Sequence, residues 1–396
     1  MRHNKASISL IVLQMALTLA ILGNAVFLIQ QQARNSTRPS GIANEADVLV
    51  VSNAWIGDPP DDQSLQATDL AALRELPGVV DAYAAFSYPL AGGGWGCTLR
   101  LASAQRSPTT WCDRYLVDAH ARTVLDVHLI AGRWFDPSEG VARGINDAES
   151  PTHVIVVTHA LADRLFPDGN ALGQTVYMER GTSQQTIIGI IGGMQTPAAA
   201  NGGPGADYSV LQPGQFVGNG VRYLIRTRPG MAASVAAKVR ATLLKANPAR
   251  VIHYVRTFPE VRARAYRGAR GYAAVLAVIC AIMLVVTAFG TIGLTMTWVT
   301  QRRREIGIRR ALGATRHAIL RQFQYENLIL AFGAVVLGIG LAVTLNLWMM
   351  RHFATQRLPM LPLLAAALVI VLIGQLAVLW PALRAATIPP ALAART

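Results

Sequence analysis

Charge-free apolar runs divide the chain into membrane-spanning and water-soluble parts. Four apolar stretches contain no Asp, Glu, Lys or Arg: 6–33, 271–301, 327–350 and 358–383. Each is longer than the roughly 20 residues that an α-helix needs to cross the hydrocarbon core of a membrane. The pattern therefore predicts four transmembrane helices. A fifth charge-free stretch, 191–206, is rich in Gly, Pro and Ala and is interpreted as a loop.

The first apolar run follows a short basic segment that contains Arg2 and Lys5. A basic segment before an apolar run is also typical of a cleaved signal peptide. The run is longer than the usual hydrophobic region of a signal peptide, and no clear small-x-small cleavage site follows it. These features favour a retained membrane anchor.

Residues 34–270 have the composition of a soluble domain. A strand, helix and strand pattern near 48–86 recurs near 221–258, which predicts one α+β subdomain assembled from both ends of this region. The intervening segment, about 95–220, is mostly β-like, with one expected helix around Thr158–Phe166. Its segment Gly192–Gly205 is expected to be a mobile surface loop because it is rich in Gly and Pro.

The net charge of +14 lies mainly outside the soluble domain. From Arg34 to Arg270 there are 23 basic and 20 acidic residues, whereas the other segments hold 13 basic and 2 acidic residues. Basic residues beside spans set membrane orientation and contact anionic lipid headgroups, so nucleic acid is not an expected partner. The balance places both termini and the 301–326 loop in the cytoplasm, and residues 34–270 in the periplasm.

Three cysteines are present. Cys97 and Cys112 lie in two β-like runs on either side of a polar turn, so a hairpin could bring their thiols together. Whether they form a disulfide is left open, because pairing needs an oxidising compartment and suitable geometry. Cys280 lies in an apolar span and is interpreted as a small buried side chain.

The segment 301–316, QRRREIGIRRALGATR, separates the second and third spans. It predicts a short cytosolic helix supported by a Glu305–Arg309 pair, ended by Gly313 and followed by a helix that Thr315 caps. A basic loop that only sets orientation is the simplest explanation. Apolar residues interleaved with the arginines favour docking onto a partner protein.

The segment RRREIGIRRALGATR closely resembles the signature of the FtsX-like permeases, the membrane subunits of MacB-type (type VII) ABC transporters. HLIAGRWFD, ALADRLFPDGNALGQTV, IIGIIGG and WPALRAATIPPALA resemble further family segments in the same order. The resemblance implies an α-helical membrane protein with four transmembrane helices and a large periplasmic α+β domain. That domain would contain a porter-like β-α-β subdomain with an inserted β-rich subdomain.

The resemblance also implies how the chain is divided. The expected parts are a cytosolic stub and first span (1–33), a periplasmic domain (34–270; porter-like parts about 45–94 and 221–258, insert about 95–220), a second span (271–301), a cytosolic coupling helix and the start of the third transmembrane helix (302–326), a third span (327–350), a short periplasmic loop (351–357), a fourth span (358–383) and a cytosolic tail (384–396). The residues expected to couple to an ATPase are Arg302, Arg303, Arg304, Glu305, Ile306, Gly307, Ile308, Arg309, Arg310, Ala311, Leu312, Gly313, Ala314 and Thr315.

The partners implied by the family are a nucleotide-binding ABC ATPase, a second permease chain, and an adaptor with an outer-membrane channel. Lys5, Lys238 and Lys245 are followed by Ala, Val and Ala, so this sequence contains no Gly-Lys-Ser/Thr phosphate-binding loop. No cofactor is therefore expected in this chain, and ATP and Mg²⁺ would be bound by the ATPase.

Small and hydroxyl residues recur at helical spacing in two of the spans. They permit close helix approach, either within the chain or at a dimer seam. The residues concerned are Thr287, Thr291 and Thr295 in the second span, and Ala334, Gly338 and Ala342 in the third.

No catalytic motif is found: the sequence has no HExxH and no GxSxG, and His153 and His159 lack partners at zinc spacing. The leading functional hypothesis is the permease subunit of an ATP-driven, MacB-type efflux pump for a small molecule or peptide. The alternatives are a non-transporting transducer that activates a periplasmic partner such as a cell-wall hydrolase, a lipoprotein-release permease, and a membrane-anchored receptor. The sequence does not identify the substrate.

Overall fold

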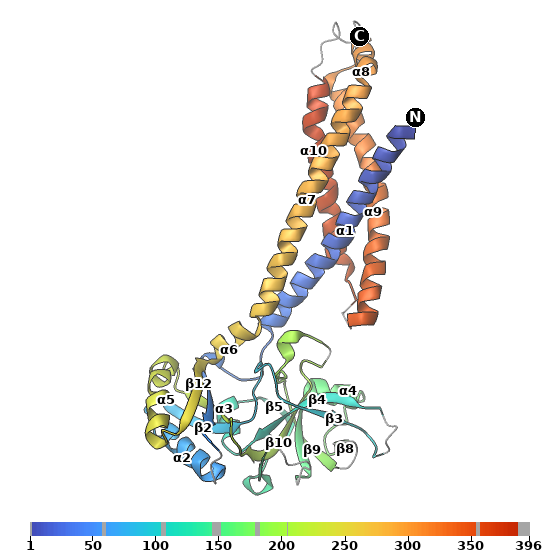
Figure 1. The fold of residues 1–396 in the computed structure, drawn as a ribbon. Coiled ribbons are helices and arrows are strands. Elements are labelled where there is room, and N and C mark those ends of the chain that lie inside the picture. The colour runs from blue at the N-terminus through green and yellow to red at the C-terminus, as the bar shows by residue number, and fades with distance from the viewer. Residues whose placement is uncertain are drawn as a thin grey trace. The chain divides into compact units, whose positions relative to one another are not determined.

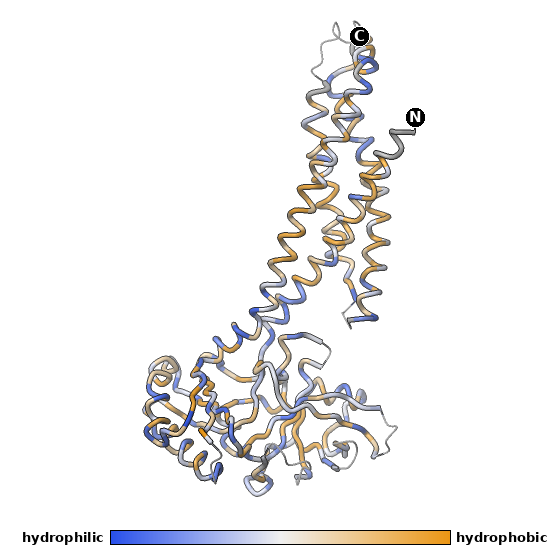
Figure 2. Tube along the Cα trace, in the orientation of Figure 1, coloured by the Kyte–Doolittle hydropathy of each residue, from blue (hydrophilic) through white to orange (hydrophobic). Residues whose placement is uncertain are grey.

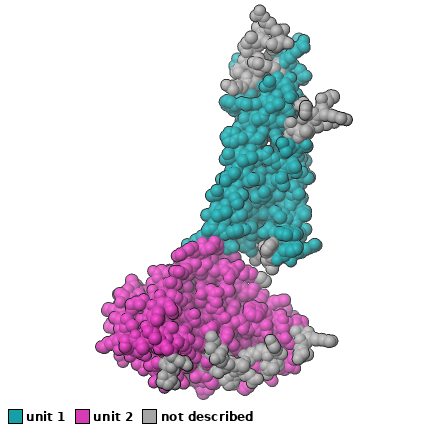
Figure 3. Space-filling model, in the orientation of Figure 1, with its two compact units in different colours: residues 1–34, 270–396 teal, residues 35–269 magenta. Residues whose placement is uncertain are grey.

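The computed structural model describes residues 2–57, 61–103, 108–144, 152–178, 183–203, 205–353 and 357–386. The chain forms two compact units (Figure 3). One consists of Met1–Arg34 and Arg270–Thr396, and the other consists of Asn35–Ala269. The expected tail (384–396) and the loop at 351–357 lie partly outside the described residues.

The first unit is a helical bundle (Figure 1). Its long helices are α1 (Arg2–Thr37), α7 (Arg267–Gln301), α9 (Arg316–Phe353) and α10 (Met360–Ala386), and the short helix α8 (Arg303–Ala311) connects α7 to α9. Within the described residues, these four long helices are long and apolar enough to cross a membrane, and they are coloured as hydrophobic along most of their length in Figure 2. The predicted four transmembrane helices are confirmed.

Helix α1 is the most buried of the four spans. Met15 and Leu19 are fully buried in a cluster with Ala331 and Ala334 of α9. The outer faces of α7, α9 and α10 carry exposed large apolar side chains, such as Phe289, Ile329 and Leu361. Such faces are stable against lipid but not against water, so the bundle has the surface of a membrane domain.

The second unit contains an antiparallel four-stranded sheet in the order β12-β1-β11-β2. Its strands are β1 (Val48–Trp55), β2 (Val79–Ala85), β11 (Arg222–Thr227) and β12 (Arg250–Thr257). Helices α2 (Asp62–Arg74) and α5 (Ala232–Ala246) cover one face. The expected strand-helix-strand pattern at both ends of the region is therefore present, with the strands interleaved in one sheet.

Side chains of β1 alternate between two cores because successive residues of a strand point to opposite faces. Leu49 and Val51 pack with the apolar residues of α2 and α5. Val48 and Val50 pack on the other face with Phe258 of α6 (Phe258–Ala265). Both faces of the strand are buried, which explains its continuous apolar sequence.

A buried ion pair connects strand β12 of the first sheet to helix α2, which covers that sheet. Arg250 of β12 donates to both carboxylate oxygens of Asp69 of α2, at 2.6 and 2.7 Å, and both side chains are almost fully buried. The Tyr223 hydroxyl of β11 also donates to Asp69, at 2.6 Å. The carboxylate is thus fully hydrogen-bonded, which offsets the cost of burying its charge.

The inserted segment forms an eight-stranded mixed sheet, in the order β3-β4-β10-β7-β9-β5 with β6 paired to β10 and β8 to β9. Its strands are β3 (Trp95–Leu99), β4 (Thr110–Val117), β5 (Leu129–Gly132), β6 (Val141–Arg143), β7 (Val154–Thr158), β8 (Thr175–Met178), β9 (Ser183–Ile191) and β10 (Ser209–Phe216). Helix α4 (His159–Leu165) corresponds to the single helix expected in this segment.

Two expectations for the insert were wrong. A second helix, α3 (Ala121–Leu125), is present, and the Asp118 carboxylate supports its start by accepting hydrogen bonds from the backbone N–H groups of His120 and Ala121, both at 3.0 Å. The segment beginning at Gly192 is also not a free surface loop. Met194, Gln195 and Thr196 are buried, and their backbone groups are hydrogen-bonded to Ser209, Ser40 and Ala206, respectively.

Candidate functional site

The connection between the second and third spans is helix α8 followed by a tight turn into α9. Gly313 has a φ of 96°, a left-handed conformation that ends α8 and that glycine adopts without strain. The Thr315 hydroxyl accepts a hydrogen bond from the Ala318 backbone N–H at 3.2 Å, as expected for a residue that caps α9. The predicted helix end and cap are both confirmed.

One apolar residue anchors α8 to the bundle. Ile306 is only 6% exposed and packs with Ile319 and Phe323 of α9 and with Val378 and Ala382 of α10. Gly307, next to it, is also buried. Displacing α8 would therefore disturb packing at the start of α9 and near the end of α10.

Polar contacts add to this anchor. The Arg302 guanidinium donates to both oxygens of Glu326 of α9, at 2.8 and 2.9 Å. Arg309 donates to Gln322 at 2.7 Å, and Gln322 donates to Glu326 at 3.2 Å. The expected Glu305–Arg309 pair is not formed in the described part of the chain, since Arg309 reaches across to α9 instead.

The opposite side of α8 is open. Ile308 is 53% exposed, and Leu312, which directly follows α8, is 83% exposed. The Leu312 backbone N–H donates to the Ile308 carbonyl at 3.1 Å, so the helical turn extends to Leu312 and both side chains share one face. Arg304, Glu305 and Arg309 are also exposed. We call Ile308 and Leu312 the α8 apolar pair. Of the other expected coupling residues, Ala314 is half-buried and Thr315 is exposed, and the side chains of Arg303, Arg310 and Ala311 lie outside the described part.

The small residues of α7 and α9 pack within the chain. Thr287 hydrogen-bonds the Thr18 hydroxyl of α1 at 2.9 Å, and a side chain at Gly338 would come within 2.9 Å of Ala16 and Leu19. The amide of Asn24 in α1 donates to the carbonyl of Ala342 at 3.2 Å. Close approach to α1 therefore accounts for Thr287, Gly338 and Ala342. Thr291 and Thr295 are buried and donate to carbonyls of their own helix, and Ala334 is buried in the same core as α1.

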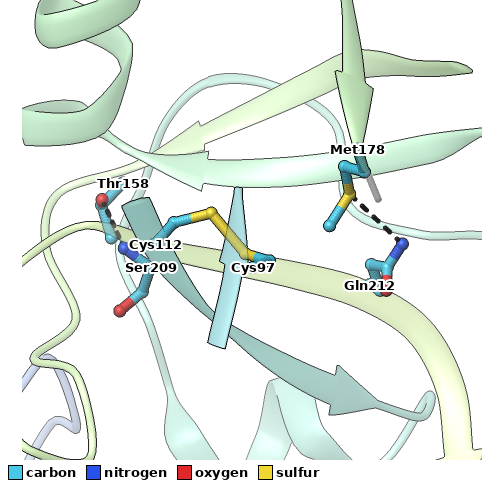
Figure 4. Close-up of a disulfide and its surroundings, with 6 residues drawn as sticks. All are labelled: Cys97, Cys112, Thr158, Met178, Ser209 and Gln212. Carbon is cyan, nitrogen blue, oxygen red and sulfur yellow. Dashed lines mark hydrogen bonds between the residues drawn. A yellow bond between two sulfur atoms is a disulfide. The ribbon is translucent and has the colours of Figure 1, made fainter. Parts of the chain in front are cut away.

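In the second unit, Cys97 and Cys112 form a disulfide between β3 and β4 (Figure 4). They face each other in the strand register, with their Cα atoms 5.1 Å apart. The disulfide fixes the hairpin of β3 and β4 at the edge of the second sheet. Figure 4 also shows the backbone N–H of Ser209 donating to the hydroxyl of Thr158, at 3.3 Å.

The segment that follows α1 is bonded to α6, the helix that precedes α7. This junction was not predicted from the sequence. Arg262 of α6 donates to Glu45 through two nitrogens and to the carbonyls of Ser36 and Arg38, at 3.2 and 2.8 Å. Burial would raise the pKa of Glu45, but hydrogen bonds from Arg262 and Ser40 outweigh it and hold the pKa below its ordinary value. Glu45 is therefore ionised, and the junction is a charge-assisted contact.

The same segment also binds the second sheet. The Gln195 backbone N–H donates to the carbonyl of Ser40 at 2.8 Å, and the Tyr115 hydroxyl donates to the carbonyl of Gln195 at 2.7 Å. Arg38 forms an ion pair with Asp207. Residues that directly follow the first span are thus bonded to α6 and to the inserted sheet. In the sequence, Arg262 is one of four arginines at 262, 264, 267 and 270 that precede the second span, and no local signal connects it to Glu45.

Two known protein families match this chain and identify the class to which it belongs. Residues 15–246 match the MacB-like periplasmic core domain, and residues 277–390 match the FtsX-like permease C-terminal domain. The chain belongs to the MacB-like, FtsX-like permease family. MacB-like permeases of this family are inner-membrane proteins with a large periplasmic domain, and both parts are present here.

Individual relatives of this permease are distant. The macrolide export ATP-binding/permease protein MacB of Neisseria gonorrhoeae is 26% identical over 282 residues, 69% of this chain and 40% of that protein. The probable syringafactin export ATP-binding/permease protein SyfD of Pseudomonas syringae is 28% identical over 216 residues, 52% of this chain and 31% of that protein. The chain therefore spans less than half the length of these relatives.

Two solved structures also match the MacB-like part of the chain. The periplasmic region of MacB from Actinobacillus actinomycetemcomitans is 14% identical and has a TM-score of 0.36, with 57% of this chain and 94% of that one covered. The extracellular domain of the transporter YknZ from Gram-positive bacteria is 13% identical and has a TM-score of 0.33, with 52% and 100% covered.

Among the described residues, no three His, Cys, Asp or Glu side chains are grouped closely enough to hold a metal ion. His159 instead contacts Asp163 at 2.9 Å on the exposed side of α4. The two contacts that bear on the function of this permease are the packing of Ile306 of α8 and the bonds of Arg262 to Glu45.

Proposed function

We propose that this chain is the permease subunit of an ATP-driven export system, in which a separate ATPase drives conformational change in the periplasmic domain. The observation that carries the proposal is the two-sided structure of α8. Ile306 fixes the helix to α9 and α10, and the α8 apolar pair is exposed beside arginines. An exposed apolar pair on an anchored helix suits a groove on a partner protein.

The proposed assembly contains two permease chains and two ATPase chains, with ATP and Mg²⁺ bound by the ATPase. An adaptor and an outer-membrane channel would complete the export path. Two relatives are named as exporters, one of macrolides and one, provisionally, of syringafactin, and this supports export of a small molecule or peptide over the transducer and lipoprotein-release alternatives. The junction at Arg262 would carry movement of the spans into both sheets of the periplasmic domain.

Replacing Gly313 by proline tests this proposal. Proline fixes φ near −65°, far from the 96° observed, so the turn between α8 and α9 must change. We expect the Gly313→Pro variant to insert into the membrane normally but to lose about 90% of the permease-dependent stimulation of its ATPase, measured in reconstituted vesicles.

Gly313→Asn is the matched control, since asparagine tolerates a left-handed backbone and should keep most of the stimulation. Equal stimulation by the wild-type and Gly313→Pro chains would show that this connection does not transmit force. Glu305→Lys, which reverses an exposed charge on α8, tests the electrostatic part of the same surface.

A further inference from the structure

An open cavity of about 750 Å³ lies within the periplasmic unit, between the start of β4, helix α4 and the loop that precedes β10. Its lining includes Trp111 and Asp113 of β4, Arg164 of α4, and Thr196 and Tyr208. We call it the Trp111 cavity. It lies next to the Cys97–Cys112 disulfide, which fixes the strands that carry its aromatic wall.

The strand β4 presents Trp111, Asp113 and Tyr115 on one face, because alternate residues of a strand share a face. Tyr115 is buried, and its hydroxyl holds the loop over the strand through the Gln195 carbonyl. Trp111, at the other end, is 62% exposed. Asp113 lies between them in sequence, is half-buried, and lines the cavity together with residues of the loop.

Asp113 is a half-buried carboxylate that has no counter-ion among the described residues. Its side chain forms no hydrogen bond and no ion pair with the described residues. Burial raises the pKa of Asp113, which reflects the cost of holding its negative charge away from water. A cation brought into the cavity would lower that cost.

Trp111 is held in place without being covered. A Cβ atom added to Gly96 of β3 would lie 2.2 Å from an atom of the Trp111 ring, so the ring occupies the space that a side chain at Gly96 would fill. Glycine is therefore needed here for the ring to lie against the hairpin. The exposed part of the ring is an uncovered aromatic surface beside an uncompensated carboxylate.

We propose that the Trp111 cavity binds an organic cation, with its amine or ammonium group at Asp113 and its apolar part against Trp111. Aromatic faces attract cations, and a nearby carboxylate strengthens this attraction. Arg164, the other charged residue in the lining, is exposed on α4, so water screens its charge more strongly than that of Asp113. The proposal names a substrate class for the proposed export function, and it rests on that function only for what happens to the ligand after binding.

Calorimetric titration of the full chain in detergent with benzyltrimethylammonium tests the proposal. This probe combines an aromatic ring with a permanent positive charge. We expect saturable binding by the wild type, and about five- to tenfold weaker binding by Asp113→Asn, which removes the charge at constant shape. Gly96→Ala, which displaces the ring and keeps the charge, should weaken binding similarly. Asp168→Asn, at an exposed carboxylate outside the cavity, is the control and should bind as the wild type does.

Three outcomes would overturn the proposal: no binding of the probe by the wild type, equal binding by the wild type and Asp113→Asn, or tighter binding of benzenesulfonate, which would indicate an anion site at Arg164. Benzyl alcohol, a neutral analogue, should bind more weakly than the cation. Gly313→Pro separates this proposal from the proposed function, because it should lose ATPase stimulation and still bind the probe.

Discussion

Replacing both Ile308 and Leu312 by glutamate is expected to lower the affinity of the chain for its proposed ATPase partner about a hundredfold or more. Both side chains are more than half exposed in the chain alone. Burying a side chain of this size at an interface stabilises a complex by about 1.5–3 kcal/mol, and each 1.4 kcal/mol corresponds to a factor of ten in affinity. Titration of the purified ATPase against the permease in nanodiscs would measure the change.

The matched control is Leu244→Glu on the exposed side of α5, which replaces another partly exposed leucine by a negatively charged residue. This variant should bind the ATPase as the wild type does. The Ile308→Glu and Leu312→Glu double variant should keep its melting temperature, because neither side chain packs in the bundle. Unchanged affinity of the double variant would mean that the ATPase docks elsewhere.

Replacing Arg250 by methionine is expected to destabilise the periplasmic unit by about 3–5 kcal/mol. This is the usual cost of removing one partner of a buried ion pair and leaving the other charge buried without it. Asp69 would then be buried with Tyr223 as its main remaining donor. Hydrogen exchange of the backbone amides of β1 and β12 in the full chain would measure the free energy of opening.

Two further variants isolate the cause of this loss. Arg228→Met removes an exposed arginine of the same unit and should change the opening free energy by less than about 0.5 kcal/mol. Asp69→Asn combined with Arg250→Met removes both charges and should recover part of the lost stability. A loss below about 1 kcal/mol in Arg250→Met would show that the pair contributes little.

Local patterns were sufficient to predict the membrane helices and the strand-helix-strand pairs. The end of α8 at Gly313 and the cap at Thr315 were also predictable, because each depends on the chemistry of one or two neighbouring residues. The Glu305–Arg309 pair failed because Gln322, 13 residues from Arg309, offers a competing acceptor. A pair that depends on where the next helix lies is outside the reach of local rules.

Contacts between distant segments could not be predicted. Asp69 and Arg250 are 181 residues apart, and Glu45 and Arg262 are 217 apart, so no spacing rule connects them. The segment around Gln195 was misjudged for a related reason. Its Gly- and Pro-rich composition indicates irregular backbone, but only the fold shows that Tyr115 and Ser40 bind that backbone.

The central claim is that ATP hydrolysis by a partner ATPase docked on α8 moves the periplasmic domain. A spin label would be attached to the cysteine of a Lys238→Cys variant, since Lys238 is exposed on α5. The labels on two paired chains would report the distance between their periplasmic units in the complete complex. The described free cysteine, Cys280, is buried and should not compete for the label. We expect the distance distribution to shift when ATP and vanadate are added, and to stay unchanged in the Gly313→Pro variant. An identical distribution with and without nucleotide in the wild type would contradict the proposed coupling.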